Sequence, residues 1–95
     1  MVQTLDEIRA SHRGRLDIIA HILKSAVGGV RKTSIMYQCN LSFKQLETYL
    51  GFLLTKNLLK AFTRRESAPS KFFETTDRGK DFLRAYQNLN ALMST

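Results

Sequence analysis

The chain has 95 residues, of which 43% are hydrophobic and 24% are charged, which fits one small soluble domain and excludes a disordered tail. Its 15 lysines and arginines outnumber its 8 aspartates and glutamates, giving a formal net charge of +7 and a pI near 10.0. This balance favours an anionic partner, with nucleic acid ahead of a membrane surface.

Cysteine and histidine usage argues against metal or redox chemistry. Cys39 is the only cysteine, so the chain can form neither an intrachain disulfide nor a thiolate cluster, and Cys39 itself is predicted to be a core residue. His12 and His21 are too far apart to share a metal ion on one helical turn, so no metal or other cofactor is expected. Asp6 and Glu7 precede any apolar run, and no run of about 18 apolar residues occurs, so neither a signal peptide nor a membrane span is expected, and a cytoplasmic location is predicted.

The N-terminal third contains an arm and one amphipathic helix. Residues 1–12 are predicted to form the arm, which is helical if Thr4 and Glu7 act as a capping box. From Leu16 to Val27, apolar residues recur at the spacing of three and four that is typical of one helical face. Gly28 and Gly29 then end this predicted first helix.

Two further helices follow, joined by a tight turn. Val30 fits a one-bridge strand, and residues 32–39 are predicted to form a short second helix. Ser42 and Gln45 have the spacing of a capping box, so the third helix is predicted over residues 42–56.

The C-terminal half is predicted to contain a hairpin and a last helix. Two strands, at residues 58–63 and 71–75, flank a basic tip at residues 64–70, and Asn57 is predicted to end the preceding helix in the left-handed conformation. Thr76 is placed to cap a helix that begins at Asp77. Spacings of four, three and four predict a short coiled-coil seam of Phe82, Tyr86, Leu89 and Met93.

This order of elements is typical of a winged helix-turn-helix domain, which is mainly α within the α+β class. Three helices and a two-stranded wing are expected over residues 13–76, and a C-terminal dimerisation helix over residues 77–95. The third helix is then the recognition helix, which such a motif places in a DNA major groove.

Two stretches carry a resemblance to a known family. They are "KTSIMYQCNLSFKQLETYL" at residues 32–50 and "TTDRGKDFLRAYQNL" at residues 75–89, within a match that covers residues 13–92. The chain resembles the small archaeal winged helix-turn-helix DNA-binding proteins that form dimers through a C-terminal antiparallel coiled coil. The resemblance implies DNA binding and a homodimer, in a transcription-regulator or chromatin role.

The third helix has an apolar face and a polar face. A helical wheel places the apolar residues inward, and these are Phe43, Leu46, Leu50, Leu53 and Leu54. Base contacts are predicted on the polar face, from Ser42, Lys44, Gln45 and Thr48. Gln45 suits an adenine edge, and Lys44 suits guanine or a phosphate. The alternative is that this face is merely solvated.

Phosphate contacts are predicted at the start of the second helix and on the wing, from Arg31, Lys32, Thr33, Arg64, Arg65 and Lys71. Phe52 projects on the polar side of the third helix and is expected to contact protein. In the last helix, the first turn is expected to dock on the first helix, while residues from Tyr86 to Met93 meet a partner chain.

No spacing of Ser, His and acidic residues distinguishes a catalytic set, so the chain is predicted not to be an enzyme, and no small-molecule ligand is expected. The expected partners are double-stranded DNA and a second copy of the chain, in the cytoplasm and associated with the nucleoid. A different class remains open, in which the same winged helix serves as a protein-interaction module and the basic charge is incidental.

Overall fold

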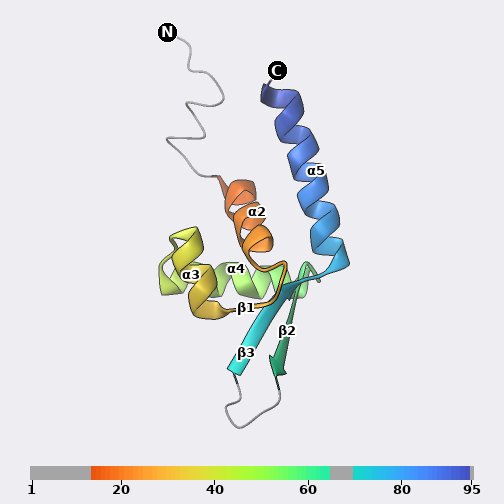
Figure 1. The fold of residues 1–95 in the computed structure, drawn as a ribbon. Helices are drawn as coiled ribbons and strands as arrows, with labels where there is room; N and C mark the ends of the chain where they lie inside the picture. Colours follow the sequence, from red (N-terminus) through yellow and green to blue (C-terminus); the bar gives the residue numbers. More distant parts are fainter. Residues whose placement is uncertain (1–13, 65–69, 95) are drawn as a thin grey trace.

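The computed structural model describes residues 14–64 and 70–94 (Figure 1). A helix precedes a very short strand, two more helices, a hairpin and a long last helix, which confirms the predicted winged helix fold. The elements are α2 (Arg15–Ser25), β1 (Val30–Arg31), α3 (Lys32–Cys39), α4 (Phe43–Thr55), β2 (Leu59–Arg64), β3 (Ser70–Thr75) and α5 (Asp77–Ser94). The predicted N-terminal arm, residues 1–12, lies outside the described residues.

The three strands form one antiparallel sheet in the order β1–β3–β2. β1 pairs Val30 with Phe73 and Arg31 with Phe72, while β2 pairs Phe62 with Phe72. The strand predicted at Val30 is thus two residues long, and it widens the base of the predicted two-stranded wing to three strands.

The core lies between α2, α3, α4 and one face of the sheet. Each of these helices and the sheet contributes at least one large side chain that is fully buried, and these are Ile22, Leu23, Ile35, Cys39, Leu46, Leu53 and Leu59. Burying each aliphatic side chain in this set stabilises the fold by about 1.5–3 kcal/mol. The prediction that Cys39 is a core residue is confirmed.

Left-handed asparagines end two of the helices, as predicted for Asn57. Asn40 has φ of 54° after α3, and Asn57 has φ of 60° after α4. Asparagine tolerates this conformation better than most residues, because its short polar side chain can hydrogen-bond locally. The tight turn after Asn40 places α4 directly after α3, as a helix-turn-helix requires.

The predicted inward faces were wrong at the helix ends. Leu16 is 53% exposed, Val27 41%, Phe43 62% and Leu54 37%. Leu16 and Phe43 lie in the first turns of their helices, Leu54 lies in a last turn, and Val27 lies beyond Ser25, where α2 ends. A helical wheel continues the periodicity past the few turns that meet a neighbouring element, so it overestimates burial at the ends.

The first turn of α5 is fastened to the end of α4. Thr76 Oγ1 accepts a hydrogen bond from Gly79 N at 3.0 Å, as predicted for a cap, and donates one to Asn57 O at 2.8 Å. Arg78 Nε donates to Lys56 O at 3.1 Å. Polar groups left without intrahelical partners at the two helix ends therefore satisfy one another. From this junction α5 rises beside α2 and extends past it, away from the sheet (Figure 1).

Candidate nucleic-acid interface

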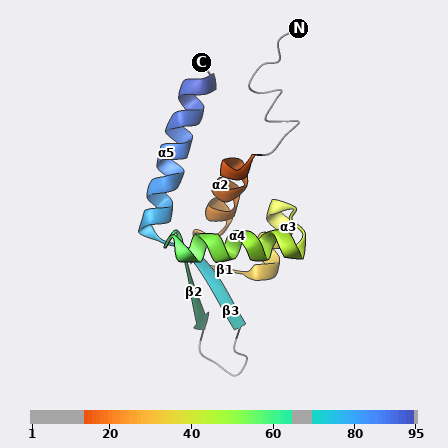
Figure 2. The ribbon, with the colours of Figure 1, turned by 180° about the vertical axis from the view of Figure 1, so that it is seen from behind.

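α4 lies across one side of the molecule, with α2 on one flank and the hairpin on the other (Figure 2). Its buried side chains, Leu46, Leu50 and Leu53, point into the core. Lys44, Thr48, Gly51 and Thr55 recur at helical spacing on the opposite, exposed side. The helix therefore presents a continuous polar stripe to solvent.

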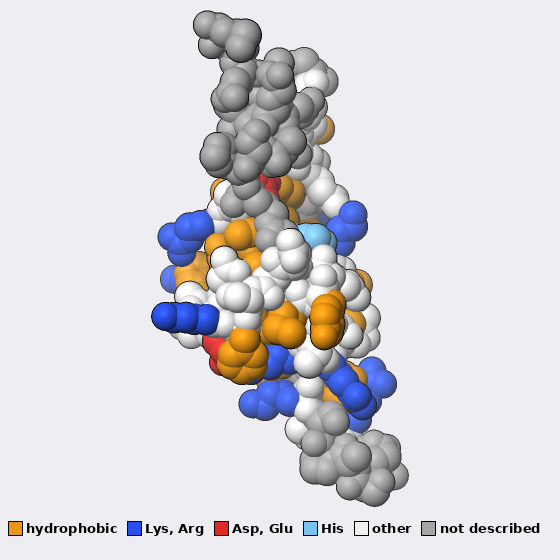
Figure 3. Space-filling view, turned by 90° about the vertical axis from the view of Figure 1, so that its left-hand side faces the viewer, with side chains coloured by type: hydrophobic (Ala, Val, Ile, Leu, Met, Phe, Trp, Pro, Cys, Tyr) orange, Lys and Arg blue, Asp and Glu red, His pale blue; other side chains and the backbone are white. Residues whose placement is uncertain are grey.

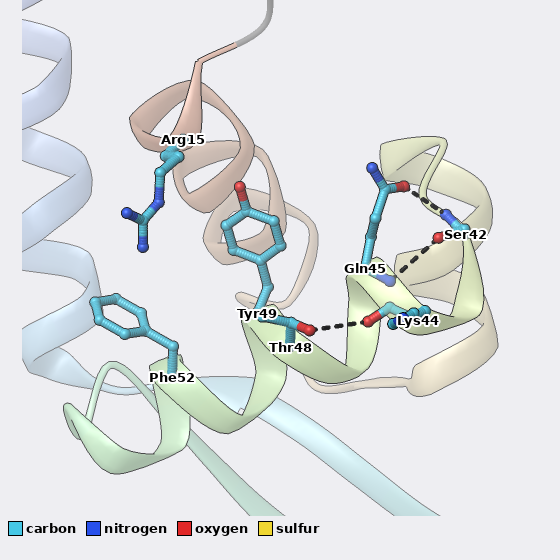
Figure 4. A pocket seen from close by; sticks show the side chains of 7 residues that line it. All are labelled: Arg15, Ser42, Lys44, Gln45, Thr48, Tyr49 and Phe52. Carbon is cyan, nitrogen blue, oxygen red and sulfur yellow. Dashed lines mark hydrogen bonds between the residues drawn. The ribbon is translucent and has the colours of Figure 1, made fainter.

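Ser42 and Gln45 form the predicted capping box at the start of α4 (Figure 4). Ser42 Oγ accepts from Gln45 N at 3.1 Å, and Ser42 N donates to Gln45 Oε1 at 2.9 Å. A bidentate contact to adenine uses both the oxygen and the nitrogen of the amide. Such a contact from Gln45 must therefore share its oxygen with the cap or release it.

Lys44 and Thr48 lie one turn apart on the stripe, and both are exposed. Thr48 Oγ1 donates to Lys44 O at 3.1 Å, so its lone pairs stay available as hydrogen-bond acceptors (Figure 4). Within the described part of the chain, a Cβ built on Gly51 would meet no atom within 4 Å. No other side chain therefore covers the stripe at Gly51 within the described residues.

A pocket of about 460 Å³ lies beside α4 on the α2 flank (Figure 4). Its wall includes the rings of Tyr49 and Phe52 and the guanidinium of Arg15, the first residue of α2. Arg15 could not be predicted from the sequence as a site residue, because only tertiary packing brings the start of α2 next to α4. The other lining residues are Ser42, Lys44, Gln45 and Thr48.

Phe52 also borders a second pocket, of about 440 Å³, together with Leu16, Ile19 and Phe82. It therefore lies on the side of α4 that is near α2 and α5, and 37% of its surface is exposed. The protein contact expected for Phe52 stays a prediction.

On the hairpin flank, cations of α3 and β3 border α4. Lys32 forms an ion pair with Glu47, one turn into α4. Lys71 comes from β3, and with Lys32, Glu47 and Gly51 it lines a groove of about 320 Å³ between the helix and the sheet. The stripe of α4 thus has Arg15 on one side and Lys32 and Lys71 on the other.

Two arginines lie on the opposite face of the sheet. The guanidinium carbons of Arg31 and Arg64 lie 5.5 and 4.5 Å from the ring centre of Phe72, which stacks on Phe62 at 5.7 Å. Side chains alternate between the faces of a strand, so Phe72 and Lys71 point to opposite sides of β3. The predicted wing cations are therefore divided between two faces.

Two predicted phosphate contacts remain. Thr33 is exposed in the first turn of α3, and Arg65 lies outside the described residues. In Figure 3, which views the molecule from the side of α3, Lys and Arg side chains gather near the sheet, with exposed hydrophobic side chains above them.

The seam predicted on α5 divides into a docked part and an exposed part. Phe82 packs against the core, and the hydroxyl of Tyr86 donates to Asp17 of α2. Intrachain contacts thus extend one turn further along α5 than expected. Leu89 and Met93 are each 50% exposed.

Within the described ranges, no helix is both long and apolar enough to cross a membrane. No group of three His, Cys, Asp or Glu side chains among residues 14–64 and 70–94 is arranged to hold a metal ion.

Comparison with solved structures finds the same fold in other proteins. The chain is similar to Sso10a-2, a DNA-binding protein from Sulfolobus solfataricus, with a TM-score of 0.75 and 21% identity over 86% of this chain and 83% of that one. It is also similar to a PadR family transcription regulator from Clostridium difficile, with a TM-score of 0.71 and 23% identity over 85% and 92% of the two chains. Diamide-treated YodB from B. subtilis has a TM-score of 0.69 and 19% identity over 96% and 90%.

Sequence comparison gives the family. No curated protein matches the chain. A family model described as winged helix-turn-helix matches residues 12–94, from the region before α2 to the end of α5. The chain belongs to this winged helix-turn-helix family.

Proposed function

We propose that the chain binds double-stranded DNA as a homodimer, with α4 in the major groove and the hairpin along the phosphate backbone. The observation that carries this proposal is the exposed polar stripe of α4 between Arg15 on one flank and Lys32 and Lys71 on the other. A helix in the major groove has a phosphate backbone on each side. Cations on both flanks match that arrangement, and the net charge of +7 supports it.

The N-cap and first half of α4 supply the base contacts. Lys44 meets guanine or a phosphate, Gln45 meets adenine, and Ser42 and Thr48 offer hydroxyl groups to either kind of base edge. All four side chains are exposed, Ser42 at the N-cap and the other three in the first half of α4, where groove contacts concentrate.

The phosphate contacts come from the start of α3 and from the wing. Arg31 and Arg64 on one face of the sheet, and Lys71 on the other, give the hairpin cations on both sides. The full proposed set, with the flank residue Arg15, is Arg15, Arg31, Lys32, Thr33, Arg64, Arg65 and Lys71.

The exposed part of α5 forms the proposed antiparallel dimer contact. Leu89 and Met93 are half exposed, and Leu92 is 74% exposed. Three large apolar side chains near the end of one helix are an unusual surface for a monomer of this size. Phe82 and Tyr86 begin the same seam, and their intrachain contacts hold α5 in position for the partner.

The similar solved structures support the setting. Sso10a-2 is a DNA-binding protein from Sulfolobus, and the Clostridium protein is a transcription regulator. We infer for this chain a regulatory or chromatin role without catalysis, in the cytoplasm and associated with the nucleoid, of the kind found in small archaeal DNA-binding proteins.

A salt titration tests the proposal. Fluorescence anisotropy would follow binding to mixed-sequence duplexes from about 50 to 200 mM salt, where contacts to six to ten phosphates weaken binding by about 10³–10⁵-fold. If no duplex is bound, or if the affinity does not change with salt concentration, the result would favour the protein-interaction module instead.

A further inference from the structure

Phe43 is the first residue of α4, and 62% of its surface is exposed. The core does not explain this phenylalanine, because the neighbouring Leu46 fills the buried position of the first turn. A polar side chain at this position would avoid the unfavourable exposure of an aromatic ring to water. The ring is therefore a candidate contact for a partner of the recognition helix.

The side chain of Lys32 lies against the ring of Phe43. Its Nζ lies 4.7 Å from the ring centre of Phe43, and the same ammonium pairs with Glu47, one turn further along α4. An ammonium over an aromatic face is attracted by the electron density of the ring. Phe43 thus contacts Lys32 at the junction of α3 and α4 while most of its surface remains open.

The charges around Phe43 indicate what can cover it. Lys32 lies against the ring with Glu47 paired to its ammonium, and the exposed Lys44 follows Phe43 directly in the chain, so these three charges leave one net positive charge beside the ring. An apolar group presented on a polyanion suits this ring better than an apolar surface on a neutral or basic protein. On the major-groove edge of a base pair, the C5-methyl group of thymine is such an apolar group, and 5-methylcytosine carries a methyl at the same carbon.

We propose that Phe43 contacts the C5-methyl group of a pyrimidine in the major groove. The chain then distinguishes thymine from uracil at one position of its site, and 5-methylcytosine from cytosine. This inference rests on the proposed function, since it requires α4 to lie in the major groove.

The test begins with duplexes selected from a random pool by the full chain. Each thymine of the selected sequence is then replaced, one at a time, by deoxyuridine, which removes only the methyl group. At one position per half-site the Kd should rise about fourfold, which is the change in affinity expected when one methyl group is no longer buried. At the same position, 5-methylcytosine should bind more tightly than cytosine.

Phe43 variants assign the effect. Phe43→Ala should bind the thymine and uracil duplexes equally at that position, while Phe43→Leu, which keeps an apolar side chain, should retain part of the difference. Tyr37→Ala is the matched control, because Tyr37 is an aromatic residue of α3 that is 80% exposed. It should leave the ratio of the two Kd values unchanged.

Three results would overturn the inference while leaving DNA binding intact. They are equal binding of thymine and uracil at every position by the parent chain, an unchanged ratio in Phe43→Ala, and a selection without any preferred sequence. Failure to bind any duplex would overturn both this inference and the proposed function.

Discussion

Gly79 determines how closely α5 approaches the end of α4. A Cβ built on this residue would lie 2.3 Å from Leu58 O and 2.6 Å from Thr75 Cγ2. The first of these atoms belongs to the backbone, so a larger side chain could be accommodated only by moving the helix. Together with the cap from Thr76, this explains why the last helix opens with the T-x-x-G pattern.

We predict that Gly79→Ala lowers the free energy of unfolding by about 1–3 kcal/mol, as overpacking of a tight contact usually does. Gly51→Ala is the matched control, since the site is open and alanine is the better helix former, and it should raise that free energy by about 0.8–1 kcal/mol. Urea denaturation of the two variants measures both effects. Equal stability of Gly79→Ala and the parent would contradict the close packing of α5.

Gln45 combines capping with proposed base reading, and two substitutions separate the roles. Gln45→Ala removes both, so it should lose preference at one base by about 1–3 kcal/mol and lose about 0.3–1.5 kcal/mol of stability. Gln45→Glu keeps an acceptor for Ser42 N, as capping boxes allow, so it should lose the same preference but keep its stability. Duplex selection and thermal melting provide the two measurements, and an unchanged base preference in both variants would rule out reading by Gln45.

At the scale of elements, the sheet carries cations on both faces. Lys71 borders α4, while Arg31 and Arg64 lie over Phe72 on the other side. Aromatic stacking restricts the motion of the two guanidinium groups, which reduces the entropy lost when they bind phosphate.

We predict that Arg64→Ala weakens binding to all duplexes alike and lowers the slope of log K against log salt by about 1, as expected for one lost phosphate contact. Arg31→Ala should behave in the same way. Lys24→Ala is the control, because Lys24 is exposed in the last turn of α2 and lines neither the pocket nor the groove beside α4. A sequence-dependent loss in Arg64→Ala would mean that the wing reads bases.

The features that could be predicted from the sequence are those that depend on residues close together in the chain. The capping box at Ser42, the left-handed Asn57 and the cap at Thr76 all follow from local hydrogen bonds and backbone sterics. The exposure of Phe43 and the position of Arg15 beside α4 were missed, because they depend on where other elements end and pack.

At the scale of the whole molecule, α5 is docked near its start and exposed near its end. We predict that Leu89→Glu gives a folded monomer that binds DNA more weakly, because a charge buried in the dimer costs several kcal/mol and the second domain no longer adds avidity. Gln87→Glu, on an exposed side of the same helix, is the control and should stay dimeric.

Analytical ultracentrifugation of the parent and both variants at micromolar concentration decides between the states. A monomeric parent, together with undiminished DNA binding by Leu89→Glu, would disprove the proposed dimer without affecting the winged helix itself.

The hydrogen bonds from Thr76 and Arg78 to Asn57 O and Lys56 O join the start of α5 to the end of α4. In the proposed dimer, the length of α5 between this junction and the seam then sets the distance between the two copies of α4. A helix rises about 5.4 Å per turn. One turn added to α5 in both subunits would therefore increase the separation of the two copies of α4 by about 11 Å along the α5 axis. Half-sites read from one side of a duplex lie one helical turn, about 34–36 Å, or a multiple of it apart, so a change of about 11 Å takes the second α4 out of phase with its half-site. Such an insertion should therefore weaken binding of the dimer to the duplex that the parent chain selects.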